Sequence, residues 1–147
     1  MSEDPAWAAP AQRLLRRAWP WLLVYAIALA VIVFWPQHID EGMGPLLEAL
    51  NRYLPIVTPR RVEFGSNILL FVPLGILLAI LLPRRRYVVM PAGFVVSLTI
   101  ESMQGIFLAG RTSSVSDLIA NTAGACIGLL AVEVAESIRR RRRRLAR

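Results

Sequence analysis

The sequence of 147 residues contains no lysine, one cysteine and one histidine. The single cysteine, Cys126, excludes a disulfide bond within the chain. The histidine, His38, has Asp40 and Glu41 nearby but lacks the ligand spacing of a four-coordinate metal site, so we predict neither a metal nor another cofactor. Charged residues make up 18% of the sequence and hydrophobic residues 56%. A soluble domain carries roughly 25% charged residues, and this composition excludes a disordered chain, a collagen-like chain and a disulfide scaffold.

Arginine and apolar residues are what the sequence has in excess. All 17 basic residues are arginine, the formal net charge is +7 and the mean hydropathy is +0.52. The length fits a single domain. High hydropathy combined with clusters of arginine indicates a membrane protein whose arginines mark the cytoplasmic edges of its helices.

Four apolar segments are candidates to cross a bilayer. They cover residues 18–36, 64–83, 87–110 and 117–137. A helix needs roughly 20 apolar residues to cross a hydrocarbon core of about 30 Å. The first segment is preceded by arginines, as the apolar core of a signal peptide is. Its apolar run is longer than the usual core of a signal peptide, and no small-residue cleavage site follows it. We therefore predict that it is retained as a spanning helix.

The distribution of arginine predicts the orientation of these segments. With the N-terminus in the cytoplasm, the inner flanks hold thirteen of the seventeen arginines: Arg13, Arg16, Arg17, residues 84–86, residues 139–144 and Arg147. Because arginine is enriched on the cytoplasmic side, both termini are expected there. The predicted fold class is an all-α bundle of four transmembrane helices in the cell membrane. Its parts are an N-terminal tail (1–17), a membrane domain (18–138) and a basic tail (139–147).

The first outer loop contains a candidate amphipathic helix over residues 45–54. Its four leucines share one face, and Glu48 and Arg52 are spaced for an i,i+4 pair. Pro45 suits a first-turn position and Pro55 a stop. We expect this helix to lie on the outer membrane surface, and an irregular loop is the alternative.

The arginine run at the C-terminus has two interpretations. Arginine neutralises phosphates of nucleic acid, but this run follows a membrane helix and has no interleaved aromatic residues for base stacking. Membrane lipids are therefore the predicted partner, and nucleic acid is not. Within the run, Arg140 is spaced to pair with Glu136 one turn earlier.

Glu101 is the most informative polar residue because it interrupts an apolar segment. It follows Tyr87 by fourteen residues, or about 21 Å of helix, which places it in the outer half of the bilayer. An acid at the centre of a spanning helix costs about 2.5–3.5 kcal/mol, so it is expected to face protein or water. Gln104 shares its face, and Gly93 and Ser97 extend the stripe inward.

Polar residues of three segments meet at the same predicted depth. Ser116 or Asp117 is the expected N-cap of the last helix. Small residues in that helix (Ala120, Gly124 and Gly128) recur every four positions and predict a packing face for another helix. The candidate binding residues are Asn67, Glu101, Gln104, Arg111, Asp117 and Asn121.

Three motifs in the second half of the chain resemble one family. Residues 66–75 (SNILLFVPLG) are similar to the N-x-x-x-F-x-P-L-G signature of the VanZ-like membrane proteins. Residues 101–104 (ESMQ) resemble their E-x-x-Q element, and Gly110-Arg111 followed by residues 117–124 (DLIANTAG) resembles their G-R…D-x-x-x-N-T-x-G element. The resemblance implies an integral membrane protein. The family's namesake is linked to resistance to the glycopeptide teicoplanin, which implies a role in the cell envelope.

Three functions remain as hypotheses. The first is a non-catalytic binder at the outer leaflet, in which Arg111 holds an anionic lipid headgroup or a cell-wall precursor through its bidentate guanidinium. The second is a membrane enzyme with Glu101 and Asp117 as acid and base; we rank it below the binder, since acid–base pairs also occur as structural ion pairs. The third is a structural cluster in which Glu101 pairs with Arg111 and Asn121 bonds across helices.

Overall fold

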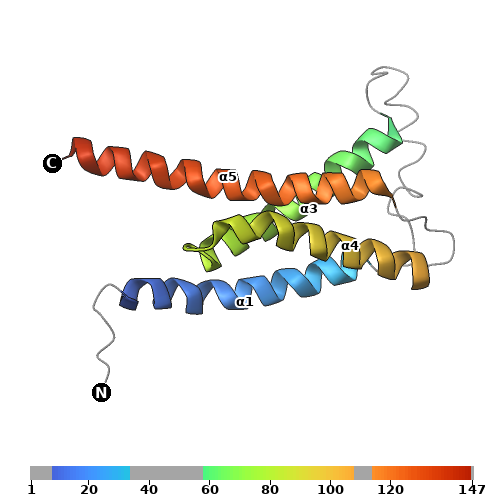
Figure 1. The fold of residues 1–147 in the computed structure, drawn as a ribbon, viewed down its shortest axis with the longest axis horizontal. Coiled ribbons are helices and arrows are strands. Elements are labelled where there is room, and N and C mark those ends of the chain that lie inside the picture. The colour runs from blue at the N-terminus through green and yellow to red at the C-terminus, as the bar shows by residue number, and fades with distance from the viewer. Residues whose placement is uncertain (1–7, 34–57, 108–113, 147) are drawn as a thin grey trace.

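The computed structural model describes residues 8–33, 58–107 and 114–146, with the side chains of α1 described from Ala18 to Ile32. Over these ranges the chain forms α1 (Ala8–Val33), α3 (Pro59–Leu81), a 3-10 turn η1 (Arg86–Val88), α4 (Val89–Phe107) and α5 (Val115–Leu145) (Figure 1). No strand occurs in these ranges, so the predicted all-α class is confirmed for them. The predicted amphipathic helix at residues 45–54 and Arg111 lie outside the described residues.

Three helices extend beyond the segments that hydropathy marks, and α1 does so by beginning at Ala8, within the predicted N-terminal tail. α3 begins at Pro59 because Thr58 caps it: the Thr58 Oγ1 accepts a hydrogen bond from the backbone N–H of Arg61 at 3.4 Å, and proline suits the first helical position. α5 continues through the arginine run to Leu145. Arginine is a good helix former and its charge interacts favourably with the C-terminal end of the helix dipole. The predicted basic tail is therefore largely a continuation of α5.

Three helical segments are long and apolar enough to cross a membrane: Pro59–Leu81, Arg86–Phe107 and Val115–Leu145. They correspond to three of the four predicted spans. In α1, the side chains that the structure describes, Ala18–Ile32, form a shorter apolar stretch.

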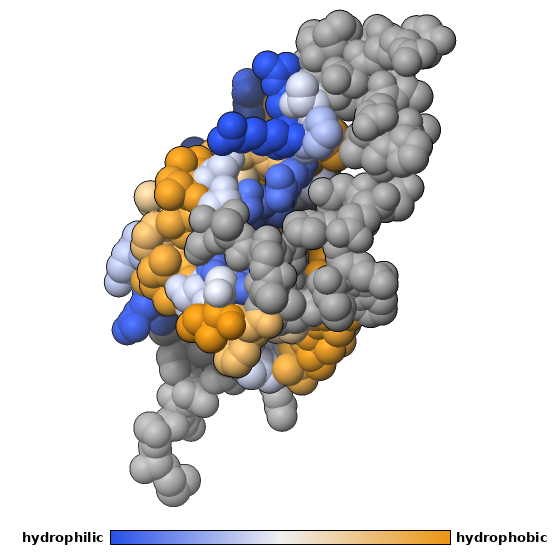
Figure 2. Space-filling view, turned by 90° about the vertical axis from the view of Figure 1, so that its right-hand side faces the viewer, coloured by the Kyte–Doolittle hydropathy of each residue, from blue (hydrophilic) through white to orange (hydrophobic). Residues whose placement is uncertain are grey.

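The helices alternate in direction along the bundle (Figure 1). In that view the N-terminal ends of α1 and α4 lie at the left, together with the C-terminal ends of α3 and α5. The opposite ends of these four helices lie at the right. We name the left end, where the arginine run of α5 lies, the arginine end, and the right end the loop end. Figure 2 looks onto the loop end and shows hydrophobic residues along the flanks, with hydrophilic residues gathered towards one side.

The closest helix contact is between α3 and α5, and it depends on residues without side chains. A Cβ atom added to Gly124 would lie 2.2 Å from the carbonyl oxygen of Ile68, and one added to Gly128 would lie 2.2 Å from that of Val72. On α3, a Cβ at Gly75 would meet the carbonyl oxygen of Ala125 at 2.1 Å. The predicted small-residue packing face of α5 is thus confirmed, with α3 as its partner.

α1 packs on the other side of α3. The Tyr25 hydroxyl donates a hydrogen bond to the carbonyl oxygen of Leu70, and Leu29 packs with Phe71 and Leu74 in the buried apolar core. Pro73 lies inside α3 and has no N–H, so the carbonyl of Leu69 lacks its usual helical donor. The contact with Tyr25 therefore falls on the turn of α3 that proline weakens.

We predict that Gly124→Ala lowers the free energy of unfolding by about 1–3 kcal/mol, because the new methyl group cannot fit without moving the α3 backbone. The measurement is thermal or denaturant unfolding in detergent micelles. Gly65→Ala is the matched control, since nothing lies within 4 Å of a Cβ built at this α3 glycine, and it is expected to be neutral or to stabilise by up to about 1 kcal/mol. Equal destabilisation by the two substitutions would contradict the close contact.

Candidate functional site

The buried face of α4 carries polar side chains towards its C-terminal end. The buried residues of the helix are Val89, Gly93, Ser97, Glu101 and Gln104. Their spacing of four, four, four and three residues keeps them on one side of the helix, and this side packs against α5. The predicted stripe from Gly93 to Gln104 is therefore confirmed as the protein-facing side of α4.

Glu101 binds the beginning of α5. Its side chain is only 7% exposed, and its Oε2 accepts a hydrogen bond of 3.0 Å from the backbone N–H of Ser114. Ser114 is the N-cap residue of α5, so the carboxylate lies at the positive end of the helix dipole. A hydrogen bond to a carboxylate is stronger than one between neutral groups, and this one joins the end of α4 to the start of α5.

The start of α5 corrects one prediction. The N-cap is Ser114, and both Ser116 and Asp117 lie inside the first turn, where the N–H of Asp117 donates to the Ser114 carbonyl at 3.1 Å. The Ser114 side chain makes no capping hydrogen bond. Because the Glu101 carboxylate comes from a neighbouring helix and supplies an acceptor here, the helix begins earlier than a local side-chain cap would set it.

Asn121, one helical turn after Asp117, connects α5 to α4. Its side chain is 4% exposed, and its Nδ2 donates a hydrogen bond of 2.9 Å to the Oγ of Ser97. Within the described part of the chain, its Oδ1 is buried without a hydrogen-bond partner. Turning the amide over would exchange the two atoms and leave the nitrogen unpaired instead. In either orientation, the Asn121 amide keeps one unused hydrogen-bonding position in the protein interior.

The six predicted site residues differ in their placement. Glu101, Gln104 and Asn121 are buried between α4 and α5, and Asp117 is half-buried in the first turn of α5. Asn67 is half-buried on α3, one residue before Ile68, whose carbonyl approaches Gly124. The described hydrogen bonds do not include the Asn67 side chain, and Arg111 lies outside the described residues. We name the residues Ser97, Glu101, Gln104 and Asn121 the buried polar cluster.

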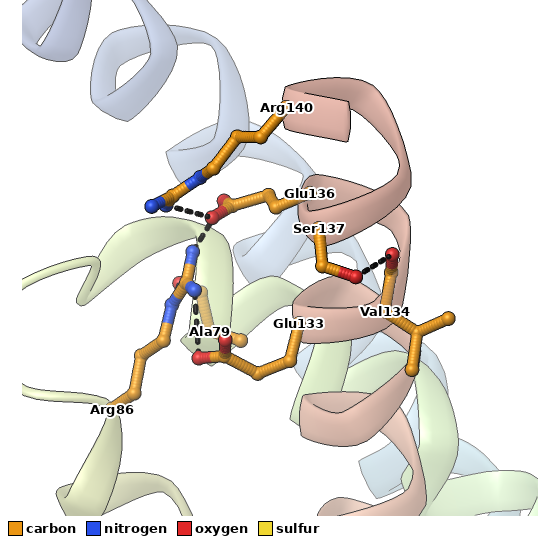
Figure 3. A network of polar contacts seen from close by, with 7 residues as sticks. All are labelled: Ala79, Arg86, Glu133, Val134, Glu136, Ser137 and Arg140. Atoms are coloured by element: carbon orange, nitrogen blue, oxygen red, sulfur yellow. Dashed lines mark hydrogen bonds and ion pairs between the residues drawn. The ribbon is translucent and has the colours of Figure 1, made fainter. Parts of the chain in front are cut away.

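A second polar network lies near the arginine end, and the sequence analysis missed it. Arg86 donates to Glu133 Oε1 at 2.7 Å, to Glu136 Oε1, and through its Nε to the Ala79 carbonyl at 3.4 Å (Figure 3). Its side chain is 15% exposed. Arg140 also binds Glu136, at 3.1 Å, which confirms the predicted i,i+4 pair. We name Arg86, Glu133, Glu136 and Arg140 the arginine-end network.

The sequence contained a signal for this network. Glu133 and Glu136 are spaced by three residues, so they share a face of α5, and the arginine triplet at residues 84–86 belongs to the same end in the predicted topology. From the sequence, that triplet served only to predict the orientation of the helices. One of its members instead joins the end of α3, the turn before α4 and the last part of α5.

Neither network resembles a metal centre. Among the residues that the structure describes, no group of three or more His, Cys, Asp and Glu side chains is arranged to hold a metal ion. The buried polar cluster offers a carboxylate, two amides and a hydroxyl, which are groups that form hydrogen bonds with a polar ligand or with one another.

Apolar helices of spanning length, with polar side chains buried between them, define a helical membrane protein. A family model described as VanZ/LLP1 matches residues 22–136, which is more than half of the chain. The chain therefore belongs to the VanZ/LLP1 family. The match includes all six predicted site residues. The searches of curated proteins and of solved structures found no match.

We predict that Arg86→Gln lowers the free energy of unfolding by about 1–2 kcal/mol, because two carboxylates lose the guanidinium that lies between them. Arg85→Gln is the matched control: it removes the same charge from the neighbouring exposed residue, which forms no ion pair within the described residues. Thermal unfolding in detergent at low and high salt measures both. Similar shifts for the two variants would show that Arg86 contributes only through net charge.

A double-mutant cycle tests the bridge between α4 and α5. Ser97→Ala and Asn121→Ala are expected to be coupled by about 0.6 kcal/mol, the average for hydrogen bonds between membrane helices. Ser102→Ala is the control, because this exposed serine on α4 uses its hydroxyl on the carbonyl of Leu98 in its own helix. A coupling with Asn121 that is as large for Ser102 as for Ser97 would contradict the bridge.

Proposed function

We propose that this protein crosses the cell membrane four times with both termini in the cytoplasm. We propose further that its buried polar cluster forms part of a site for an anionic lipid or cell-envelope ligand at the outer leaflet. The observation that carries the proposal is the unused hydrogen-bonding position of Asn121, which is buried beside Ser97 and nearly two turns from the start of α5. Buried polar groups without a partner are costly, so such a position suits a ligand group that completes it.

Support for the topology comes from charge and helix direction together. Twelve of the seventeen arginines belong to described segments that the alternating directions of the helices place towards one end of the bundle. With that end in the cytoplasm, the chain follows the positive-inside bias, and the buried polar cluster belongs to the outer half of the membrane. α1 would complete the fourth crossing through its apolar part and the residues that follow it.

The chemistry of the cluster suggests what kind of ligand it would take. A hydroxyl group both donates and accepts, so it suits Asn121 in either orientation of the amide. Arg111, which precedes Ser114 by three residues in the sequence, would hold a phosphate or carboxylate of the same ligand through its bidentate fork. A headgroup that carries both hydroxyls and an anion, such as a glycolipid or a cell-wall precursor, combines these features.

The test is mass spectrometry of the lipids that purify with the protein. Wild type is compared with Asn121→Ala and with Arg111→Lys. The second substitution keeps the positive charge but removes the guanidinium that can bind an anion in bidentate geometry. We expect one lipid species to decrease roughly tenfold in both variants, as the loss of a charge-assisted or buried hydrogen bond predicts. Thr122→Ala is the matched control, because this hydroxyl bonds the Leu118 carbonyl in its own helix. Identical lipid profiles in all four proteins would refute the binding role.

A structural role is the second candidate, and the hydrogen bond between Glu101 and the Ser114 N–H favours it. On this view the cluster holds α4 and α5 together and binds nothing else. Glu101→Ala separates the two: the structural role predicts a lower protein level with unchanged lipid bound per molecule, whereas the binding role predicts less lipid per molecule. Teicoplanin susceptibility of cells that express each variant provides a physiological readout for the envelope role that the family resemblance implies.

A further inference from the structure

The last turns of α5 form an exposed basic surface near the arginine end. The helix continues through residues 139–144 without a break, and these side chains are exposed. A shallow cleft of about 200 Å³, largely open to solvent, lies between side chains on this part of α5 and is lined by Glu136, Arg139, Arg140 and Arg143. The cleft is separate from the buried polar cluster, which lies near the opposite end of α5.

The charges around the cleft are only partly balanced. Glu136 binds Arg86 on one side and Arg140 on the other (Figure 3). Arg139 and Arg143 form no ion pair with any residue that the structure describes. Two guanidinium groups thus line the cleft without a carboxylate partner, and a third shares its partner. An anion entering the cleft would meet a net positive charge.

The helical repeat puts these groups on one side of α5. At 3.6 residues per turn, Glu136, Arg139, Arg140 and Arg143 fall within an arc of about 100°. The exposed apolar residues Leu130, Val134 and Ile138 lie roughly opposite this arc, on the face that suits lipid chains. Arg141 and Arg142 fall outside the arc. The cleft therefore faces the side of the arginine-end network and not the apolar face.

We propose that this cleft binds a phosphate group, held by Arg139 and Arg143 with Arg140 as a third ligand. Guanidinium forks match the oxygens of phosphate in bidentate geometry, and residues spaced by four on a helix lie close enough to share one anion. Arg140 is able to turn from Glu136 to the phosphate because Glu136 keeps its ion pair with Arg86. Binding therefore leaves no carboxylate of the network without a cation.

A phosphate at this position has two possible sources. The cleft lies just beyond the apolar part of α5, at the level of lipid headgroups, so an anionic phospholipid is one source. It is also open to the aqueous phase, so a soluble phosphate is the other. This proposal does not depend on the site near the loop end, because its residues and its ligand chemistry are different.

The experiment compares two double variants of the full-length protein that lose the same charge. Arg139→Gln with Arg143→Gln removes the two unpaired ligands, and Arg141→Gln with Arg142→Gln removes two arginines outside the arc. Native mass spectrometry counts phosphatidylglycerol bound from mixed nanodiscs with phosphatidylcholine, and equilibrium dialysis measures inorganic phosphate. We expect binding to fall roughly tenfold in the first variant and to stay within about twofold of wild type in the second.

The two arms identify the source of the phosphate. Selective loss of phosphatidylglycerol in the first variant supports the site with lipid as its ligand, and selective loss of inorganic phosphate supports it with a soluble ligand. Equal losses in the two variants would overturn the proposal, because they show a diffuse charge effect without a defined site. Absence of binding in wild type would also overturn it. Circular dichroism checks that each variant retains its helices.

Discussion

The direct contact between the backbones of α3 and α5 is the constraint on which the rest of the structure depends. Gly75, Gly124 and Gly128 bring carbonyl groups of one helix to the positions where side chains of the other would stand. Between apolar helices in a membrane there is little hydrophobic driving force, so close van der Waals packing has to supply the association. This contact sets where α5 lies, and α4 then packs against α5 with its polar face inward.

Polar interactions complete the fold near both ends of α5. Near the loop end, Glu101 accepts from the N-cap residue of α5, and near the arginine end Arg86 reaches Glu133 and Glu136. Both connect α5 to the segments that precede it in the chain. An unpaired polar group within the membrane is costly, so each interaction is favourable only while its partner stays in place. The two networks therefore favour one register of α5 relative to α4 and the turn before it.

Particular residues show how far the sequence predicts this arrangement. Hydropathy located the apolar parts of α3, α4 and α5 that are long enough to cross a membrane, and helical spacing identified both the buried stripe of α4 and the small-residue face of α5. These predictions succeed because they depend on the repeat of a single helix. The N-cap of α5 was predicted wrongly and the role of Arg86 was missed, since both depend on groups that come from another element.

The amino-acid sequence by itself determined which segments are apolar, which faces of the helices are polar or small, and to which family the chain belongs. Only the tertiary structure decided that Glu101 accepts from Ser114, that Asn121 reaches Ser97, and that Arg86 binds two acids of α5 and not solvent or lipid alone. The physical reason is that helical periodicity is local, whereas the partner of a charged or polar group depends on how neighbouring helices are shifted and rotated against each other. That shift is set here by a few glycines whose missing side chains allow the α3 and α5 backbones to meet.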